Sequence, residues 1–314
     1  MKSGKLGKTD IAVSMAPLGA MFLGTKQDRG ASFALLDLYR GRGGNFIDSA
    51  NIYAHWVGPQ FHGGESEVVL GEWIKARGNR HDLVIASKLG FPYADTKTGL
   101  SAKQIKDECD KSLKRLGIET IDLYFAHVDD LETPQEETLR AFADLVKAGK
   151  VRAIGASNFT TYRLALANAF ATANGLPRYE VLQQRHTYLR PRHGDNFGAQ
   201  LALTADMGEY CAAAEISIMA YSSGLGGAYS GKPDRPVPEQ YLGADTGKRL
   251  EALKQIAKEL GTTPHQVVFA WLANQANMLP LVAGTSIEQL TANLDAVEIG
   301  LTAEQMQRLD KAGE

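Results

Sequence analysis

The sequence contains little that would assign it to a special class of protein. It has only two cysteines, Cys109 and Cys211, which is too few for a disulfide framework. No stretch of about 18 apolar residues is present, and the basic start at residues 1–8 is not followed by an apolar segment of signal-peptide length. We therefore expect a soluble, cytoplasmic protein with no membrane partner, whose cysteines are reduced and partly buried.

Charge of one sign is also lacking. The chain has 34 basic and 36 acidic residues, and no run of like charge that could follow a phosphate backbone. Nucleic acid is therefore not expected as a partner, and we expect no metal site. The hydrophobic content of 44% with 22% charged residues is typical of a globular protein.

Eight short apolar runs alternate with segments that have helical spacing. No Gly-x-Gly-x-x-Gly follows the first run, and no linker rich in Pro, Gly or Ser divides the chain. This pattern favours one closed (β/α)8 barrel domain over residues 1–314, an α/β TIM barrel, rather than an open doubly wound sheet. Residues 1–14 predict an N-terminal β-hairpin ahead of the barrel. The predicted strands are 15–18, 46–47, 83–86, 121–126, 151–155, 180–182, 216–220 and 279–282.

Helix starts are marked by a hydroxyl residue followed three positions later by Glu or Gln, which is the capping-box pattern. Two of these starts add Pro at the expected first helical position. The only long irregular segment, 222–246, is typical of a functional loop. The predicted caps are Ser101-x-x-Gln104, Thr133-Pro134-x-Glu136, Thr263-Pro264-x-Gln266, Ser286-x-x-Gln289 and Thr302-x-x-Gln305.

Four ionisable residues follow three neighbouring strands, at the end of a barrel where active sites lie. They are Asp48, Tyr53, Lys88 and His127. A Lys beside a Tyr favours the phenolate and so lowers the pKa of the Tyr, while a carboxylate keeps the Lys charged. Such a Tyr can exchange a proton with a carbonyl oxygen, which His127 could orient. Taken singly, these residues also fit structural roles: an ion-paired Lys, a hydrogen-bonded His and an Asp that caps a turn.

Several ordered motifs resemble the aldo-keto reductase superfamily over nearly the whole chain. The Asp and Tyr lie in one motif, and the Lys and His follow in register. The matching passages are Asn45-Phe-Ile-Asp48-Ser-Ala-Asn-Ile-Tyr53, Gly64-Glu-Ser-Glu67-Val-Val-Leu-Gly71, Ala86-Ser-Lys88, Ser112-Leu-Lys-Arg-Leu116, Ile121-Asp-Leu-Tyr-Phe-Ala-His127 and Gly149-Lys-Val-Arg-Ala-Ile-Gly155-Ala-Ser157-Asn158-Phe159.

The resemblance implies reduction of an aldehyde or ketone, which could be a sugar, by a reduced nicotinamide cofactor. In it, Tyr53 is the general acid, Lys88 and Asp48 tune its pKa, and His127 orients the carbonyl. It further implies that Ser157, Asn158 and Gln183 hold the nicotinamide carboxamide and that Tyr221 stacks on the ring. Helix capping by Ser157-Asn158 and wall packing by Tyr221 are the structural alternatives. The other residues implied for the cofactor at this end are Gly19, Ala20 and Met21.

The far end of the cofactor is implied to lie between a glycine-rich loop and a segment after the last strand. The Arg or Lys that many relatives use against the 2′-phosphate is missing there, although Arg is a strong phosphate partner. We expect NADP(H) from the resemblance, with NAD(H) open. Ser286 and Gln289 could equally act only as a helix cap. The implied residues are Ser222, Ser223, Gly224, Leu225, Gly226, Gly227, Lys232, Gly284, Thr285, Ser286, Gln289 and Asn293.

Substrate class is left open by the sequence. Aromatic residues Phe22, Trp56, Phe91 and Tyr93 could line the pocket, and such walls stack on sugars and on aryl groups alike. A small-molecule carbonyl or sugar is the expected partner. The alternative function is a regulatory subunit with little turnover, because some relatives of this kind are cytosolic subunits of potassium channels and keep the same four residues.

Overall fold

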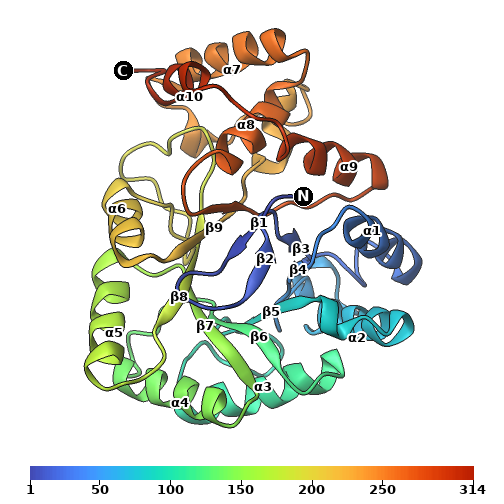
Figure 1. Cartoon of the computed structure of the whole chain (residues 1–314), viewed down its shortest axis with the longest axis vertical. Helices are drawn as coiled ribbons and strands as arrows, with labels where there is room; N and C mark the ends of the chain where they lie inside the picture. The colour runs from blue at the N-terminus through green and yellow to red at the C-terminus, as the bar shows by residue number, and fades with distance from the viewer.

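The computed structural model describes all 314 residues as a closed barrel of eight parallel strands surrounded by helices (Figure 1). Each strand pairs in parallel with its neighbour in the chain. The first and last strands close the barrel, because Gly19 N donates to Val282 O at 2.8 Å and Val282 N donates to Pro17 O at 2.9 Å. The α/β barrel expected from the sequence is confirmed. No helix has the length and apolar character needed to cross a membrane.

All eight predicted strands are present, with small differences at their ends. Six of them end one to three residues later than predicted, toward the polar positions that follow them, whereas β6 has the predicted bounds and β10 ends two residues earlier. This extension matters, because it carries the site residues on rigid backbone. The barrel strands are β3 (Leu18–Gly19), β4 (Phe46–Asp48), β5 (Val84–Leu89), β6 (Ile121–Ala126), β7 (Val151–Ser157), β8 (Tyr179–Arg185), β9 (Ser217–Tyr221) and β10 (Met278–Pro280).

Ten helices lie outside the barrel, and their apolar faces form one large core with the outer faces of the strands. Two of them exceed the one-helix-per-strand pattern: α7 precedes α8 in the β9–β10 connection, and α10 ends the chain against α7 (Figure 1). The helices are α1 (Arg29–Gly41), α2 (Glu65–Arg77), α3 (Ala102–Leu116), α4 (Gln135–Lys147), α5 (Thr161–Ala173), α6 (Ala205–Ala214), α7 (Thr246–Leu260), α8 (Pro264–Ala273), α9 (Ile287–Ala296) and α10 (Ala303–Asp310).

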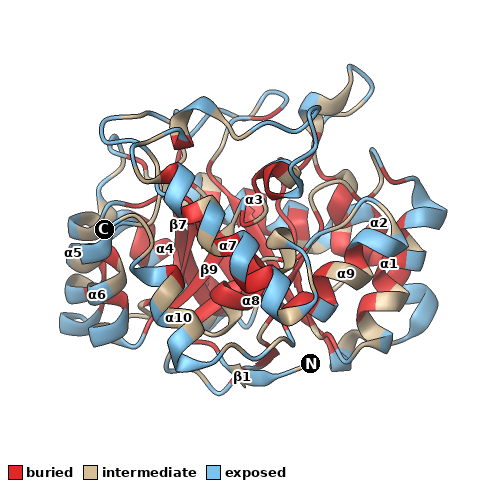
Figure 2. Cartoon of the chain, turned by 90° about the horizontal axis from the view of Figure 1, so that it is seen from above, coloured by how far each residue is buried: buried red, intermediate tan, exposed pale blue.

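The predicted N-terminal hairpin is also present, with β1 (Ser3–Lys5) antiparallel to β2 (Ala12–Ser14). It closes the barrel at the amino ends of the strands, opposite the long loops (Figure 2). Leu6, Ile11 and Val13 are fully buried and pack with inward-facing strand residues such as Phe46, in a second core that fills the barrel interior. The open mouth therefore lies at the carboxyl ends of the strands.

Four of the five predicted helix caps are confirmed, and one is wrong. Ser101, Thr263, Ser286 and Thr302 each accept a hydrogen bond from the backbone N–H three residues on, and the full reciprocal box forms at Thr263 and Thr302. Thr133 makes no such cap. Its backbone N–H donates to Asp130, Pro134 is extended with ψ of 132°, and α4 begins one residue later than expected.

Because the hairpin closes the barrel, we expect truncation of one of its buried side chains to lower the stability of the protein strongly. Leu6→Ala should lower the free energy of unfolding by about 2–5 kcal/mol, because Leu6 is fully buried. Leu131→Ala is the matched control, since Leu131 is 74% exposed and its loss should change stability by less than about 0.5 kcal/mol. Urea denaturation measures both variants. Equal midpoints for the two variants would contradict the packing role of the hairpin.

Candidate active site

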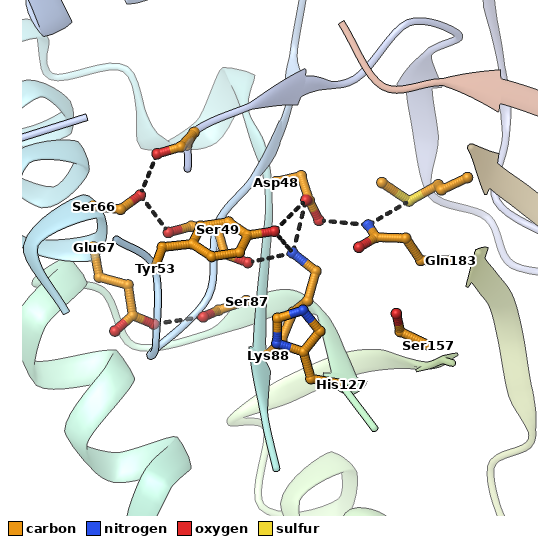
Figure 3. Close-up of polar contacts among 12 residues, drawn as sticks. Asp48, Ser49, Tyr53, Ser66, Glu67, Ser87, Lys88, His127, Ser157 and Gln183 are labelled. Atoms are coloured by element: carbon orange, nitrogen blue, oxygen red, sulfur yellow. Dashed lines mark hydrogen bonds and ion pairs between the residues drawn. The ribbon is translucent and has the colours of Figure 1, made fainter. Parts of the chain in front are cut away.

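The candidate active site is centred on the buried ammonium of Lys88, the last residue but one of β5. Lys88 Nζ donates to Asp48 Oδ2 at 2.7 Å, to Tyr53 OH at 2.6 Å and to the backbone oxygen of Ser49 at 2.7 Å (Figure 3). Both charged side chains are 0% exposed. All three N–H groups of the ammonium are therefore satisfied by protein oxygens.

The local backbone explains the spacing of five between Asp48 and Tyr53. After Asp48 ends β4, the chain continues beside β5, where Ser49 N donates to Ala86 O at 2.9 Å and Asn51 N donates to Lys88 O at 3.1 Å. A turn then brings Tyr53 back over the mouth, and its hydroxyl donates to Asp48 Oδ2 at 3.2 Å. The strand, loop and neighbouring strand thus assemble the three side chains predicted from the sequence.

The electrostatics of this group differ from the sequence expectation that Lys88 lowers the pKa of Tyr53. Burial raises the pKa of Tyr53 well above its usual range, and the carboxylate of Asp48 adds to this shift. Burial also lowers the pKa of Lys88, which Asp48 opposes. The expectation was wrong because it considered the Lys charge without the desolvation of the phenol. Tyr53 therefore holds its proton.

His127 follows β6 and lies beside the phenol. Its ring makes an edge contact with Tyr53 at 5.9 Å between centroids, and another with Phe91 at 4.8 Å. The Nδ1 atom is buried without a hydrogen-bond partner. Burial and the charge of Lys88 hold the pKa of His127 well below its usual range, so the imidazole is neutral. The four residues predicted as catalytic are thus brought together.

Side chains from the opposite wall of the barrel reach the same carboxylate. Gln183 Nε2 donates to Asp48 Oδ1 at 3.0 Å, and its amide oxygen accepts no hydrogen bond from the protein. Ser157 is fully buried and accepts from Asn158 Nδ2 at 3.1 Å. The Ser157 hydroxyl proton and the Gln183 amide oxygen therefore remain available to a ligand.

The side chain of Asn158 joins three protein segments around the site. Asn158 adopts φ of 58°, and its amide donates to the backbone oxygen of His127 at 2.9 Å. Its Oδ1 accepts from Tyr221 OH at 2.7 Å and from Leu201 N at 3.1 Å. Because these partners occupy the amide, Asn158 holds His127 and Tyr221 in place, and direct contact with a cofactor stays a prediction.

The loop after β9 turns tightly, with several residues in the left-handed backbone region. Ser222, Leu225, Gly226 and Gly227 have positive φ angles between 45° and 95°. Gly224 faces His265, so that a Cβ there would lie 2.6 Å from the ring. These backbone angles shape residues 222–227 as a tight strap over the barrel rim.

His265, on α8, lies between the strap and the segment after β10. Its Nε2 lies 3.1 Å from Asn293 Oδ1, and Asn293 Nδ2 donates to Ala283 O at 2.7 Å. Gln289 Oε1 accepts from the N–H and hydroxyl of Thr285, which leaves its amide N–H groups free. The predicted far-end residues thus lie on two connected segments, with Lys232 exposed on the strap side and Gly284, Ser286 and Asn293 on the other.

The residues predicted to line the substrate side divide into two groups. Phe22 and Phe91 are half-buried and Trp56 is 52% exposed, so these rings remain available at the mouth. Tyr93 is buried, and its hydroxyl donates to Glu108 on α3, which indicates a supporting role. Ala20 and Met21 follow Gly19 at the end of β3, where Ala20 N donates to Asp48 O at 2.9 Å.

Sequence reasoning missed several residues around the site. The hydroxyls of Ser49 and Ser66 form a hydrogen bond with each other. Glu67 accepts a hydrogen bond from Ser87, the residue before Lys88. The signal for these residues was present in the Gly64-Glu-Ser-Glu67 motif, which the sequence assigned to a helix without a role. His265 gave no signal, because it follows Thr263-Pro264 and looked like part of a helix start.

Comparison with known proteins agrees with this geometry. The model of the aldo/keto reductase family matches residues 17–314. The chain is 32% identical to the uncharacterized oxidoreductase YrpG of Bacillus subtilis, over 97% of this chain and 94% of that protein. It is 29% identical to an aryl-alcohol dehydrogenase [NADP(+)] of Phanerodontia chrysosporium, over 95% of this chain and 82% of that protein. It is 28% identical to norsolorinic acid reductase A of Aspergillus parasiticus, over 96% of this chain and 78% of that protein.

The family match covers the whole barrel, from the strand that closes it to the last helix. The motifs that carry the buried Lys88 group lie inside that range. The chain therefore belongs to the aldo/keto reductase family, whose members are oxidoreductases that use a nicotinamide cofactor to reduce carbonyl groups.

Proposed function

We propose that this chain reduces an aldehyde or ketone to an alcohol with Tyr53 as the general acid. The observation that carries this assignment is the contact of Lys88 Nζ with Tyr53 OH at 2.6 Å, inside a fully buried ion pair with Asp48. The raised pKa of Tyr53 keeps its proton on the hydroxyl until negative charge develops on the substrate oxygen. The Lys88 ammonium then stabilises the phenolate as it forms.

His127 fixes the direction of the carbonyl in this proposal. A neutral imidazole can donate one N–H to the carbonyl oxygen without competing for the proton that Tyr53 delivers. The lowered pKa of His127 supports this role, because the ring stays neutral at physiological pH. Asn158 supports it as well, by holding the His127 backbone oxygen.

The residues around the barrel mouth fit a nicotinamide cofactor, which supplies the hydride when bound. A carboxamide has one acceptor and two donor hydrogens, and the unoccupied Ser157 hydroxyl proton and Gln183 amide oxygen complement it. The ring of Tyr221 is oriented by its bond to Asn158, which supports a stacking role. Gly19, Ala20 and Met21 border the same opening beside Asp48.

We favour NADP(H) over NAD(H) as the cofactor. The start of α9 offers the hydroxyl of Ser286, the free amide N–H groups of Gln289 and backbone N–H groups to a phosphate. The Thr285 hydroxyl already donates to Gln289 Oε1. The glycine-rich strap 222–227 with Lys232 would cross the pyrophosphate. A similar relative is named for NADP(+), which also supports this preference.

We further propose an aromatic aldehyde or ketone as the substrate, in preference to a sugar. The edge contact of Phe91 with His127 puts an aromatic ring directly beside the proposed carbonyl position. Phe22 and Trp56 offer further apolar surface at the mouth. Binding there would remove the apolar surface of an aryl group from water, whereas a sugar would be left with hydroxyl groups that have no hydrogen-bond partners. The name of one similar protein, an aryl-alcohol dehydrogenase, agrees with this class.

A kinetic comparison tests the function. Nicotinamide absorbance should show a higher kcat/KM for substituted benzaldehydes than for aldose sugars. Tyr53→Phe should lower kcat for the best aldehyde by about 100-fold or more, with little change in cofactor affinity, because the hydroxyl acts on charge that develops only in the transition state.

Tyr124→Phe is the matched control for that comparison. Tyr124 is buried outside the barrel interior, and its hydroxyl has no hydrogen-bond partner, so its loss should leave turnover unchanged. Retained activity in Tyr53→Phe would refute the assignment of the acid. Cofactor binding without turnover of any carbonyl by the unaltered chain would refute the enzymatic function and favour a regulatory one.

The pH dependence of reduction tests the state of His127. Because its pKa is well below the usual value of about 6.5, the ring should already be neutral at pH 5.5, and kcat should not rise between pH 5.5 and 7.5. His127→Asn should lower kcat while keeping the same flat profile. A rise in kcat near pH 6.5 that disappears in this variant would contradict the neutral ring.

Cofactor preference can be tested by direct binding. The unaltered chain should bind NADPH more tightly than NADH. Added salt should weaken the binding of NADPH more than the binding of NADH. Gln289→Arg should widen the preference by about tenfold, because a cation then meets the 2′-phosphate. Gln289→Met controls for the lost cap at Thr285 without adding charge. Equal or tighter binding of NADH by the unaltered chain would overturn the preference.

A further inference from the structure

The third hydrogen bond of Lys88 leads to a serine outside the barrel. Its acceptor is the backbone oxygen of Ser49, and Ser49 Oγ lies 2.8 Å from Ser66 Oγ in the first turn of α2 (Figure 3). Ser66 Oγ in turn donates to the backbone oxygen of Ala20 at 2.8 Å. The buried Ser66 hydroxyl thus joins the segments after β3 and β4, next to the peptide oxygen that accepts a hydrogen bond from Lys88.

The next residue of α2 holds the strand that carries Lys88. Glu67 is 0% exposed, and its Oε1 accepts from Ser87 Oγ at 2.5 Å, while its Oε2 accepts from Arg115 Nε at 2.6 Å. Ser87 immediately precedes Lys88, and successive side chains of a strand point to opposite faces. Glu67 therefore anchors β5 from outside at the point where Lys88 enters the site.

We propose that Ser66 and Glu67 are positioning residues, which fix Ser49 and Ser87 so that the Lys88 ammonium stays within hydrogen-bond distance of Tyr53. Neither residue reaches the reacting atoms. A misplacement of about 1 Å within an active site can lower the rate about 100-fold, so a short anchor of this kind has a large effect. The consequence for catalysis rests on the proposed function, whereas the geometry can be tested without it.

The charges around Lys88 give the inference a second measurable consequence. The titratable groups around it are Asp48 and Tyr53 from the β4 segment, His127 after β6 and, on the outer face of β5, Glu67 from α2. Burial lowers the pKa of Lys88, and the charges of Asp48 and then Glu67 oppose that shift. Removing the Glu67 charge therefore lowers the pKa of Lys88 further. Loss of the Lys88 proton should lower kcat at alkaline pH, because the ammonium then no longer stabilises the phenolate, and this fall should move to lower pH when the Glu67 charge is removed.

Kinetic analysis of Ser66→Ala, Ser87→Ala and Glu67→Gln tests the catalytic consequence. We expect kcat to fall by about 10- to 100-fold in Glu67→Gln and by less in the serine variants, with KM and cofactor affinity nearly unchanged. Ser87→Ala combined with Glu67→Gln should cost little more than Glu67→Gln alone, because both changes weaken the same contact between residues 67 and 87. Glu67→Gln should also move the alkaline limb to lower pH.

Asp122→Asn separates positioning from general loss of stability. Asp122 is a buried carboxylate at the other end of the barrel, where it pairs with Arg80 at 2.8 Å and with Arg152 at 2.9 Å. It should lose thermal stability like Glu67→Gln but keep kcat and the pH profile. Unchanged kcat and pH profile in Glu67→Gln would overturn the inference, as would the same kinetic losses in Asp122→Asn.

Crystal structures of Glu67→Gln and Ser66→Ala test the geometry without turnover. The distance from Lys88 Nζ to Tyr53 OH should lengthen beyond about 3.5 Å in at least one of them. An unchanged contact in both would overturn the positioning role. If the unaltered chain reduces no carbonyl, the proposed function fails, and these two structures alone still decide for or against the inference. If Glu67→Gln does not fold, the two serine variants provide the test.

Discussion

The structure depends on keeping one ammonium ion charged inside the barrel. Removing a charged group from water costs several kcal/mol, so Lys88 is tolerated only where every N–H finds an oxygen and a carboxylate lies beside it. Asp48, Ser49 and Tyr53 meet that demand from one short segment, the end of β4 and the loop that follows it. Ser49 N and Asn51 N donate to backbone oxygens of β5, which keeps that segment beside the strand.

The same constraint supports the proposed role of the phenol as an acid. In a dry site next to a carboxylate, Tyr53 is more stable with its proton than without it. The proton becomes transferable when a carbonyl oxygen gains negative charge, because the Lys88 ammonium already lies beside the phenol to stabilise the phenolate. His127 is neutral for the same reason of burial, so in the proposed reaction it can orient the carbonyl without adding a competing proton.

Much of this arrangement could be predicted from the sequence. Apolar runs ending in Asp48, Lys88 and His127 predicted both the strands and the common mouth, since the carboxyl ends of parallel strands meet at one end of a barrel. The hairpin and four helix caps were readable from short local patterns.

Features that depend on long-range contacts could not be predicted. The role of Pro134 was misread because Asp130, in the loop after β6, holds the preceding turn. The bond between Glu67 and Ser87 joins a helix to a strand, so no local pattern reveals it. The pKa of Tyr53 was predicted in the wrong direction because spacing shows which charges are near but not how much water is excluded. Burial, which decided the sign, is a property of the complete fold.

The most direct test of this account is an NMR titration of Tyr53 in protein labelled at the tyrosine ring carbon that bears the hydroxyl, with the resonance assigned by comparison with Tyr53→Phe. The account predicts that the Tyr53 signal stays in its protonated position at and beyond pH 10, near the usual pKa of the side chain. Ionisation of Tyr53 well below pH 10 would contradict it.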